Sequence, residues 1–303
     1  MGAQAMTFEA IANEFIQHCQ VKGLSYHTLR AYRQDLNDFL TWSIRNSETQ
    51  LLSKKAITAW IADMRNRGQA PTSIKRRVAC VKVLCRWMED EERLDENPFH
   101  KIRLNIRLPR RLPRNLNQYE LKVLFGNRQR RVMDFRDNTL ALALELLFTT
   151  GVRVGELCNI RIQDMDLIAG TIVIKGKGNR ERQVFLVDDV ITRQVFAYIK
   201  RRNKLFCKTD CLLVTVRGAA ATPDHIRKLL HKHVEALNVE RRITPHMLRH
   251  SAATQLIENG VDIRFVQKLL GHASISTTEI YTHVSDASLQ DAIRTANPRG
   301  RIK

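Results

Sequence analysis

Two side chains near the carboxyl end of the chain are spaced so that they could act together on a phosphate. His246 and Arg249 lie three residues apart, directly after Thr244 and Pro245, a pair that is typical of a helix start. Residues three apart share one face of a helix, and the N-terminus of a helix attracts anions. A histidine and an arginine at such a place predict a phosphate site.

The same segment permits two other interpretations. His246 and His250 lie four residues apart, which is the spacing of a zinc-binding pair. The glutamate of the HExxH pattern is missing, however, and no third ligand is evident. The plainest alternative is a helix whose histidine and arginine simply face solvent.

Other residues able to take part in such chemistry occur at ordered intervals. Arg153 stands at a predicted junction of a turn and a helix, and Lys177 follows 24 residues later in a Gly-rich segment. His272 comes 23 residues after Arg249, and Tyr281 comes nine residues after His272. The segment around Lys177 lacks the GxxxxGK[ST] spacing of a nucleotide-binding loop, so no nucleotide is expected.

The composition describes the molecule that must position these residues. With 303 residues, of which 44% are hydrophobic, the chain is long enough for two domains with their own cores. The formal net charge of +19 predicts a polyanionic partner, DNA or RNA. No secretory signal or membrane-spanning apolar run is evident, so we expect a cytoplasmic protein, free of membranes, with reduced thiols at its six cysteines.

Hydrophobic periodicity in the first 95 or so residues predicts four helices. Ser25 and Ser53 are expected to cap the second and third, Pro71 opens the fourth, and Gly23 and Gly68 end the first and third. Basic and polar residues off the apolar stripes are candidates for contacts with phosphates or bases: Arg30, Thr72, Lys75 and Arg76.

A different segment follows this helical module. Residues 101–114 hold six basic residues and no acidic one, and Pro109 and Pro113 prevent a continuous helix. We expect an extended linker that lies along a nucleic acid, with Arg110 and Arg111 in contact with it. The predicted division is a helical domain at 1–98, a linker at 99–116 and a catalytic domain at 117–303.

The predicted catalytic domain mixes helices with a small sheet. Strands are expected at 171–174 and 182–187, joined by a hairpin tip that carries Lys177. Asp262 is expected to cap a helix that Gly271 ends, and Ser276 and Thr277 to cap a short helix carrying Tyr281. The other predicted helices are 118–125, 138–149, a short one within 152–159, 189–204, 223–235 and one that begins at Pro245 and ends at Gly260.

The predicted catalytic domain contains four motifs in order: TGVRVGEL, KGKGNRER, PHMLRHSAAT and LLGHASISTTEIYTH. These motifs and their order resemble the tyrosine recombinase, or phage integrase, family. The resemblance covers nearly the whole chain, and its layout is most similar to the Xer-type recombinases. It implies a mainly α fold with a small β-sheet: a four-helix, SAM-like core-binding domain and an α+β catalytic domain that close on DNA as a C-shaped clamp. The catalytic set it implies is Arg153, Lys177, His246, Arg249, His272 and Tyr281.

Physical chemistry suggests a role for each member of that set. Arg153 and Arg249 would stabilise the charge of a pentavalent phosphorus transition state. Tyr281 would attack the phosphorus, with His246 as the acceptor of its proton. Lys177 would protonate the leaving 5′-oxygen, and His272 would hydrogen-bond the phosphate or orient its neighbours. No metal or other cofactor is expected.

The resemblance also implies an assembly. Four protomers, as a homo- or hetero-tetramer on two inverted-repeat DNA sites, would exchange strands through a Holliday junction on the nucleoid. The tail after Tyr281 contains a short amphipathic piece, Leu289, Ala292 and Ile293, which could dock on a neighbouring subunit or pack on its own domain. Three modes of action are left open: the chain could act alone, with a paralogous chain or with an activating protein.

Three other functions remain as alternatives. A type IB topoisomerase uses similar Arg, Lys, His and Tyr chemistry but relaxes supercoils without site specificity. A DNA-binding regulator that has lost catalysis would keep the charge pattern. A His-based metallohydrolase would require the zinc site at His246 and His250.

Overall fold

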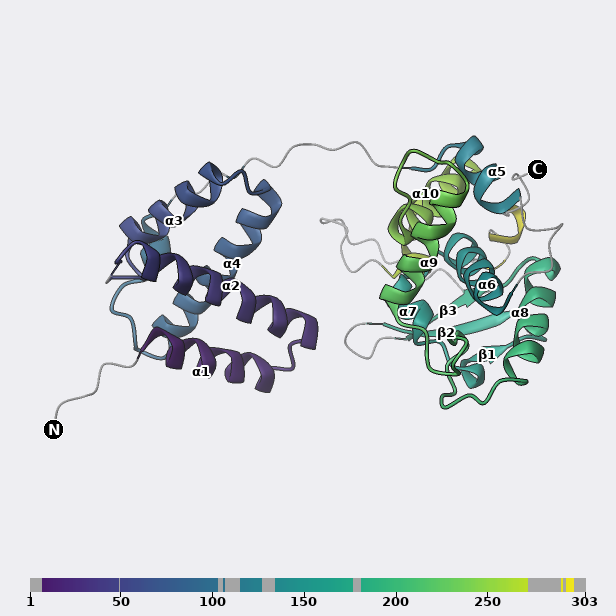
Figure 1. Ribbon diagram of the computed structural model, residues 1–303, viewed down its shortest axis with the longest axis horizontal. Coiled ribbons are helices and arrows are strands. Elements are labelled where there is room, and N and C mark those ends of the chain that lie inside the picture. Colours follow the sequence, from purple (N-terminus) through teal and green to yellow (C-terminus); the bar gives the residue numbers. More distant parts are fainter. Residues whose placement is uncertain are drawn as a thin grey trace. The chain divides into compact units, whose positions relative to one another are not determined.

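The computed structural model describes residues 7–48, 50–102, 106, 115–126, 134–176, 181–271, 290 and 293–296. The chain forms two compact units, residues 1–111 and 112–303, each with its own hydrophobic core (Figure 1). Within the described part of the chain, every helix is too short or too polar to cross a membrane.

The first unit contains the four predicted helices: α1 (Phe8–Val21), α2 (Tyr26–Arg45), α3 (Lys54–Asn66) and α4 (Pro71–Asp90). The hydroxyl groups of Ser25 and Ser53 accept hydrogen bonds from the first turns of α2 and α3, so both predicted caps are confirmed. Their apolar stripes meet in one core, where the rings of Phe39 and Trp60 lie 4.6 Å apart.

The second unit is built around α6 (Phe135–Thr150), which is buried on every side from Thr139 onward. It packs against α8 (Asp189–Arg202), α9 (Pro223–Ala236) and α10 (Pro245–Glu258) (Figure 1). Further helices of this unit are α5 (Gln118–Gly126), α7 (Val154–Cys158), the 3₁₀ helix η2 (Ile162–Asp164) and α11 (Ile263–Leu270).

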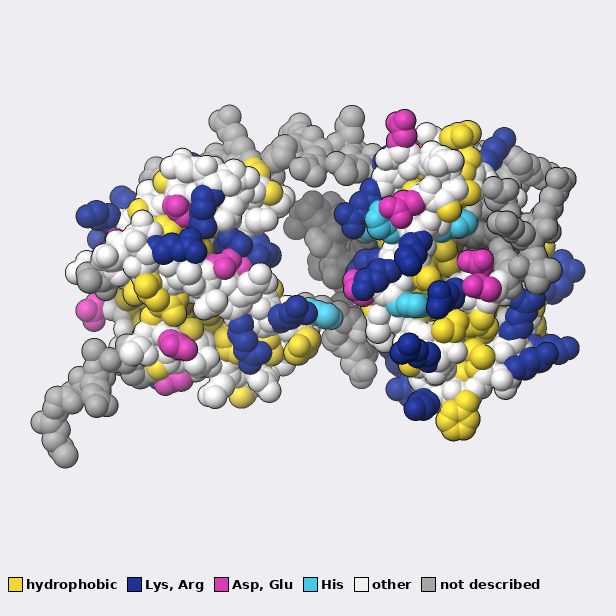
Figure 2. Space-filling model, in the orientation of Figure 1, with side chains coloured by type: hydrophobic (Ala, Val, Ile, Leu, Met, Phe, Trp, Pro, Cys, Tyr) yellow, Lys and Arg dark blue, Asp and Glu magenta, His cyan; other side chains and the backbone are white. Residues whose placement is uncertain are grey.

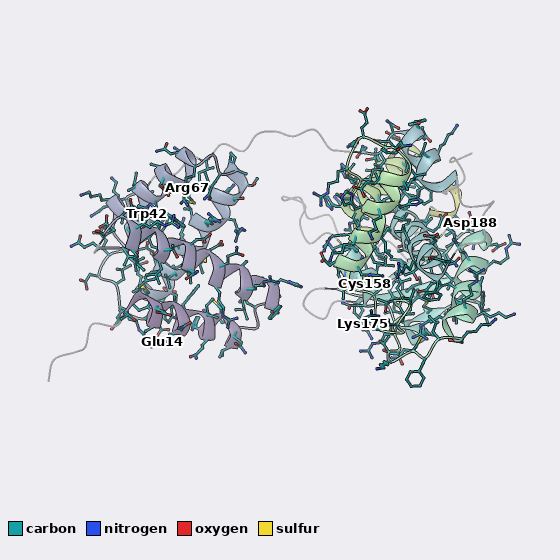
Figure 3. The ribbon with its side chains drawn as sticks, viewed as in Figure 1. Glu14, Trp42, Arg67, Cys158, Lys175 and Asp188 are labelled. Carbon is teal, nitrogen blue, oxygen red and sulfur yellow. The ribbon has the colours of Figure 1, made fainter. Side chains whose placement is uncertain are left out.

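The sheet has three antiparallel strands in the order β1-β2-β3: β1 (Met165–Asp166), β2 (Thr171–Lys175) and β3 (Glu181–Phe185). Lys175, labelled in Figure 3, ends β2 and pairs in register with Glu181 at the start of β3. Lys177, in the connection between them, lies outside the described residues. The predicted class, mainly α with a small β-sheet, is confirmed.

The element boundaries differ from the predictions where local capping decides them. Helix α6 begins at Phe135, not at residue 138, because the Asp134 carboxylate accepts a hydrogen bond from the Asp137 main-chain N–H. Helix α7 (Val154–Cys158), in contrast, lies within the predicted range 152–159, and Arg153 precedes it as an N-cap with an extended backbone, at the predicted junction of turn and helix. The prediction missed β1, whose two residues are too few for a periodic pattern.

Both ends of the predicted linker pack on a core. Phe99, in the short 3₁₀ helix Pro98–His100, is buried in the core of the first unit. Leu116 is buried in the second unit, and its main-chain N–H donates to the Ser251 hydroxyl at 2.7 Å. The Asn115 side chain donates to the Thr254 hydroxyl at 3.0 Å. The linker therefore enters the second unit along α10.

Candidate active site

The site begins at the turn between α6 and α7. Gly151 caps α6 in the left-handed conformation, with φ of 63°, and reverses the chain. Arg153 follows as the N-cap of α7, and the Glu156 carboxylate accepts from both its main-chain N–H at 2.8 Å and its guanidinium at 2.7 Å. The side chain of Arg153 is nevertheless 48% exposed, so an incoming anion could reach it.

The Glu156 carboxylate is shared by a second arginine. Arg182, on β3, donates from its two terminal nitrogens to the two oxygens of Glu156, at 3.2 and 2.7 Å. Burial alone would raise the pKa of Glu156, but the hydrogen bonds from Arg182 and Arg153 outweigh it and lower that pKa to about 2. One permanent negative charge thus holds two cations in place.

Arg249 is the buried member of the site. It lies in the first half of α10, only 5% exposed, and its guanidinium donates to the main-chain carbonyls of Gly151 and Leu270, the latter at 2.7 Å. Burial and the nearby charge of Arg153 lower its pKa to about 10, which still leaves it charged at neutral pH.

Three guanidinium groups converge on the carboxyl end of α11. Arg182 Nε donates to the carbonyl of Leu269 at 2.9 Å, and Arg249 donates to that of Leu270. Arg153 reaches the carbonyl of Gly271 at 3.4 Å. The last carbonyls of a helix lack intrahelical partners and carry partial negative charge, which cations there offset. The three arginines therefore fix the point at which the chain leaves α11 toward residue 272.

His246 lines a hollow beside this cluster. The cavity has a volume of about 270 Å³ and is walled by Val154, next to Arg153, and by residues of α9, of the start of α10 and of the loop between these two helices. Figure 2 shows Lys, Arg and His side chains gathered on the face of this unit over α9 and α10. The basic side chains that line the cavity are Arg227, His231, Arg242 and His246. The first turn of α10, which Thr244 caps, opens into it.

This arrangement suits a phosphate diester. The half-exposed guanidinium of Arg153 and the deeper one of Arg249 share the environment of Glu156, whose nearest oxygen is 4.0 Å from Arg249. His246 lies one turn before Arg249 and faces the hollow. Lys177, His272 and Tyr281, the other predicted catalytic residues, lie outside the described residues.

Sequence reasoning missed Glu156 and Arg182. Glu156 carried one local signal, because it lies three residues after Arg153 at the start of a helix, where a carboxylate completes a capping box. Arg182 ends the motif KGKGNRER, but no local signal marked its contacts, since its partners are 26 and 87 residues away in the chain.

The described residues contain no group of three or more His, Cys, Asp or Glu side chains that could hold a metal ion. His246, the first member of the alternative zinc pair, is exposed at the hollow. The metal interpretation therefore gains no support from the part of the chain that the structure describes.

The DNA-binding candidates of the first unit lie on two adjacent helices. Thr72, Lys75 and Arg76 are exposed on one face of α4, and Arg30 is exposed on α2. Arg76 also forms an ion pair with the buried carboxylate of Asp35, which joins α4 to α2. Its guanidinium is therefore partly engaged within the protein. Arg110 and Arg111 lie outside the described residues.

The described part of the tail packs on its own unit. Ile293 and Ala296 are 1% and 8% exposed within the core, and the Asn259 side chain donates to the Ala296 carbonyl at 2.9 Å. This part matches the second of the two expectations for the tail. Leu289 and Ala292 lie outside the described residues.

Comparison with family models gives two matches, which together cover both units. Residues 12–92 match the phage integrase N-terminal SAM-like domain, and residues 114–288 match the phage integrase family. Among curated proteins, the chain is 34% identical to tyrosine recombinase XerD of Halalkalibacterium halodurans, over 92% of this chain and 94% of that protein. It is 33% identical to tyrosine recombinase XerC of Anoxybacillus flavithermus, over 95% and 97%.

Solved structures show the same relationship. The chain is similar to the XerH site-specific recombinase bound to its difH substrate before cleavage, with a TM-score of 0.69 and 25% identity over 95% of this chain and 84% of that one. It also shares the fold of a lambda integrase tetramer bound to a Holliday junction, with a TM-score of 0.67 and 19% identity over 92% and 81%.

Proposed function

The chain belongs to the phage integrase family, and on that premise we propose that it is a site-specific DNA recombinase that breaks and rejoins strands through Tyr281. The observation that carries the proposal is the pair of guanidinium groups of Arg153 and Arg249, held around Glu156 at the end of α11 beside the hollow at His246. Two fixed cations at one point are what a transferring phosphoryl group requires.

The proposed cleavage step is a substitution at phosphorus. The Tyr281 oxygen forms a bond to the phosphorus as the bond to the 5′-oxygen breaks, which leaves a 3′-phosphotyrosyl strand. His246 accepts the phenolic proton, and Lys177 gives a proton to the departing 5′-oxygen. Arg153 and Arg249 stabilise the added negative charge, and His272 hydrogen-bonds the phosphate. Arginines here take the part that metal ions play in many nucleases.

Rejoining reverses the same step. A 5′-hydroxyl attacks the tyrosyl phosphodiester and gives its proton to Lys177, while Tyr281 leaves with the proton that His246 returns. Because the diester conserves the energy of the original bond, no nucleotide is needed. Exchange between two inverted-repeat sites would pass through a Holliday junction within a homo- or hetero-tetramer, with or without an activating protein. A similar structure is a lambda integrase tetramer on a Holliday junction.

Both units are proposed to grip the DNA as a clamp. The first would contact it through the exposed face of Arg30, Thr72, Lys75 and Arg76, and the linker through Arg110 and Arg111. The second would bind backbone phosphates at the hollow of Arg227, Arg242 and His246. The domain limits of 1–98, 99–116 and 117–303 belong to this proposal, as does a place on the cytoplasmic nucleoid.

A covalent trap tests the proposal even though the target sequence is not specified in advance. The wild-type chain is incubated with sheared genomic DNA, and protein-linked fragments are recovered and sequenced to map the cleaved site. A duplex of that site is then prepared with a nick close to the cleavage point. Cleavage releases a short strand from this duplex, and because that strand carries the 5′-hydroxyl needed for rejoining, the covalent adduct accumulates. We expect a denaturant-resistant adduct with the wild type, unaffected by chelator, and none with Tyr281→Phe. An adduct that persists in Tyr281→Phe refutes the assignment.

A plasmid that carries two copies of the mapped site distinguishes recombination from relaxation. A recombinase gives resolved or inverted products, whereas a type IB topoisomerase changes only the linking number. A regulator without catalysis binds the site and gives neither product nor adduct.

A further inference from the structure

Arg182 joins three elements of the second unit through one side chain. Its two terminal nitrogens bind the two oxygens of Glu156 on α7, and its Nε binds the carbonyl of Leu269 at the end of α11. It lies on β3 and its side chain is only 14% exposed. Neither Arg182 nor the groups that it contacts, Glu156 and the carbonyl of Leu269, react in the proposed cleavage step.

The geometry requires an arginine. A guanidinium presents donors on two edges in a fixed plane, so one edge can match a carboxylate while the other reaches a carbonyl. A lysine ammonium could approach Glu156 but could not span both of its oxygens and Leu269 at once. Glu156 in turn holds the main chain and the guanidinium of Arg153. Arg182 is thus connected to Arg153 through one shared carboxylate.

We propose that Arg182 is a positioning residue of strand cleavage: it fixes Glu156, and through it the guanidinium of Arg153, against the carboxyl end of α11. It does not contact the DNA itself. The inference rests on the proposed function, because it assigns Arg182 to the placement of a charge that is needed only when a phosphodiester reacts. Without Arg182, Glu156 keeps its bonds to Arg153 but loses its anchor to the sheet and to α11.

Two other roles for Arg182 must be separated from this one. It could merely fasten the fold, or it could act through Lys177, which lies five residues earlier, before the same strand. The nicked duplex of the mapped site can be made in three forms that tell them apart. One has the natural phosphate, the second has a neutral methylphosphonate at the cleaved position, and the third has a bridging 5′-sulfur.

Each modified form removes the need for one group. A methylphosphonate lacks one anionic oxygen, so misplacement of a guanidinium slows its cleavage less than it slows cleavage of the phosphate. A 5′-thiolate leaves without a proton, so loss of a general acid costs it little. Fold damage reduces the rates on all three forms alike, so the ratio of two rates within one variant does not depend on how much protein is folded.

The variants are Arg182→Gln, Arg182→Lys and the benchmark Arg153→Gln, with Arg193→Gln as the control for loss of an exposed positive charge on α8. We expect Arg182→Gln to cleave the phosphate about 10- to 100-fold more slowly than the wild type, since small misplacement of a catalytic group has effects of that size. Like Arg153→Gln, it should recover most of this loss on the methylphosphonate and none on the 5′-sulfur form. Arg182→Lys should stay within a few-fold of Arg182→Gln, and Arg193→Gln should match the wild type.

Three results would overturn the inference. If Arg182→Gln lost the same factor in cleavage rate on the phosphate and on the methylphosphonate, Arg182 would only stabilise the fold. Recovery of the cleavage rate of Arg182→Gln on the 5′-sulfur form would mean that Arg182 acts through Lys177. Full activity of Arg182→Lys would mean that the two-pronged contact of a guanidinium with Glu156 is not needed. If the wild type itself forms no adduct, the proposed function fails and not this inference alone.

Discussion

Glu156 binds both the main-chain N–H and the guanidinium of Arg153, three residues earlier, at 2.8 and 2.7 Å. The carboxylate that caps α7 is therefore also the group that orients the exposed arginine of the site. Since Arg182 and Arg249 lie near the same carboxylate, the charge of Glu156 should matter for stability and for catalysis together.

The charge of Glu156 predicts a pH dependence of stability. The pKa of Glu156 is lowered from 4.5 to about 2 in the folded state, so its carboxylate stabilises the fold above pH 4.5, and this contribution is lost as the pH falls toward 2. Glu156→Gln should reduce the free energy of unfolding at neutral pH by about 3 kcal/mol. The difference in unfolding free energy between the wild type and Glu156→Gln, measured by urea denaturation, should then become smaller as the pH falls. A difference that stays constant down to pH 2 would contradict the prediction.

Arg249 predicts a different pH effect. Burial disfavours a cation at this position and lowers the pKa of Arg249 to about 10. A lysine there starts from a lower pKa than arginine and should lose its proton at a lower pH than an exposed lysine does. Arg249→Lys should cleave the nicked duplex about 10²-fold more slowly near neutral pH, with a further loss relative to wild type as the pH rises. Single-turnover cleavage at several pH values, with Arg193→Lys as the control, checks this.

Lys75 is expected to contribute one contact with a DNA phosphate. It is exposed on α4 in line with Thr72 and Arg76, whose guanidinium is already paired with Asp35. Lys75→Gln should weaken binding uniformly across sequences and reduce the slope of log affinity against log salt by about 1. Fluorescence anisotropy over a salt series measures that slope. Lys22→Gln, at the end of α1, should leave it unchanged, and equal effects of both variants would remove Lys75 from the contact face.

Gly218 predicts a stability effect that depends on space as well as on backbone conformation. Both Gly218 and Gly260 have positive φ, at 72° and 86°. A Cβ at Gly218 would clash with the main-chain oxygen of Phe206, whereas a Cβ at Gly260 would have no described residue within 4 Å. Gly260→Ala should cost about 1 kcal/mol of unfolding free energy from backbone strain. Gly218→Ala should cost about 3 kcal/mol or more, because a main-chain carbonyl must also move. Similar midpoints in urea would refute this distinction.

The sequence predicted what local signals encode. Helix starts at Ser25, Ser53 and Thr244 are confirmed because a side-chain cap and the apolar stripe that follows are both visible within a few residues. The central helix α6 shows little periodicity, since it is buried on all sides, and its predicted start is three residues late.

The support around the candidate site could not be predicted in the same way. Arg153 and Arg249 were found by their motifs, but most of the groups that bind them are main-chain carbonyls, of Gly151, Leu270 and Gly271. Carbonyl groups are common to all residues and leave no mark in a sequence. The contact of Arg182 with Glu156 needed the fold to bring a strand and a helix together.

The attachment of Leu116 and Asn115 to α10 has a mechanical consequence. Their partners, Ser251 and Thr254, lie two and five residues after Arg249 on the same helix. Any tension carried by the chain between the two units would be applied first to the helix that bears His246 and Arg249. Because of this attachment, a pull on the linker would act on the positions of His246 and Arg249.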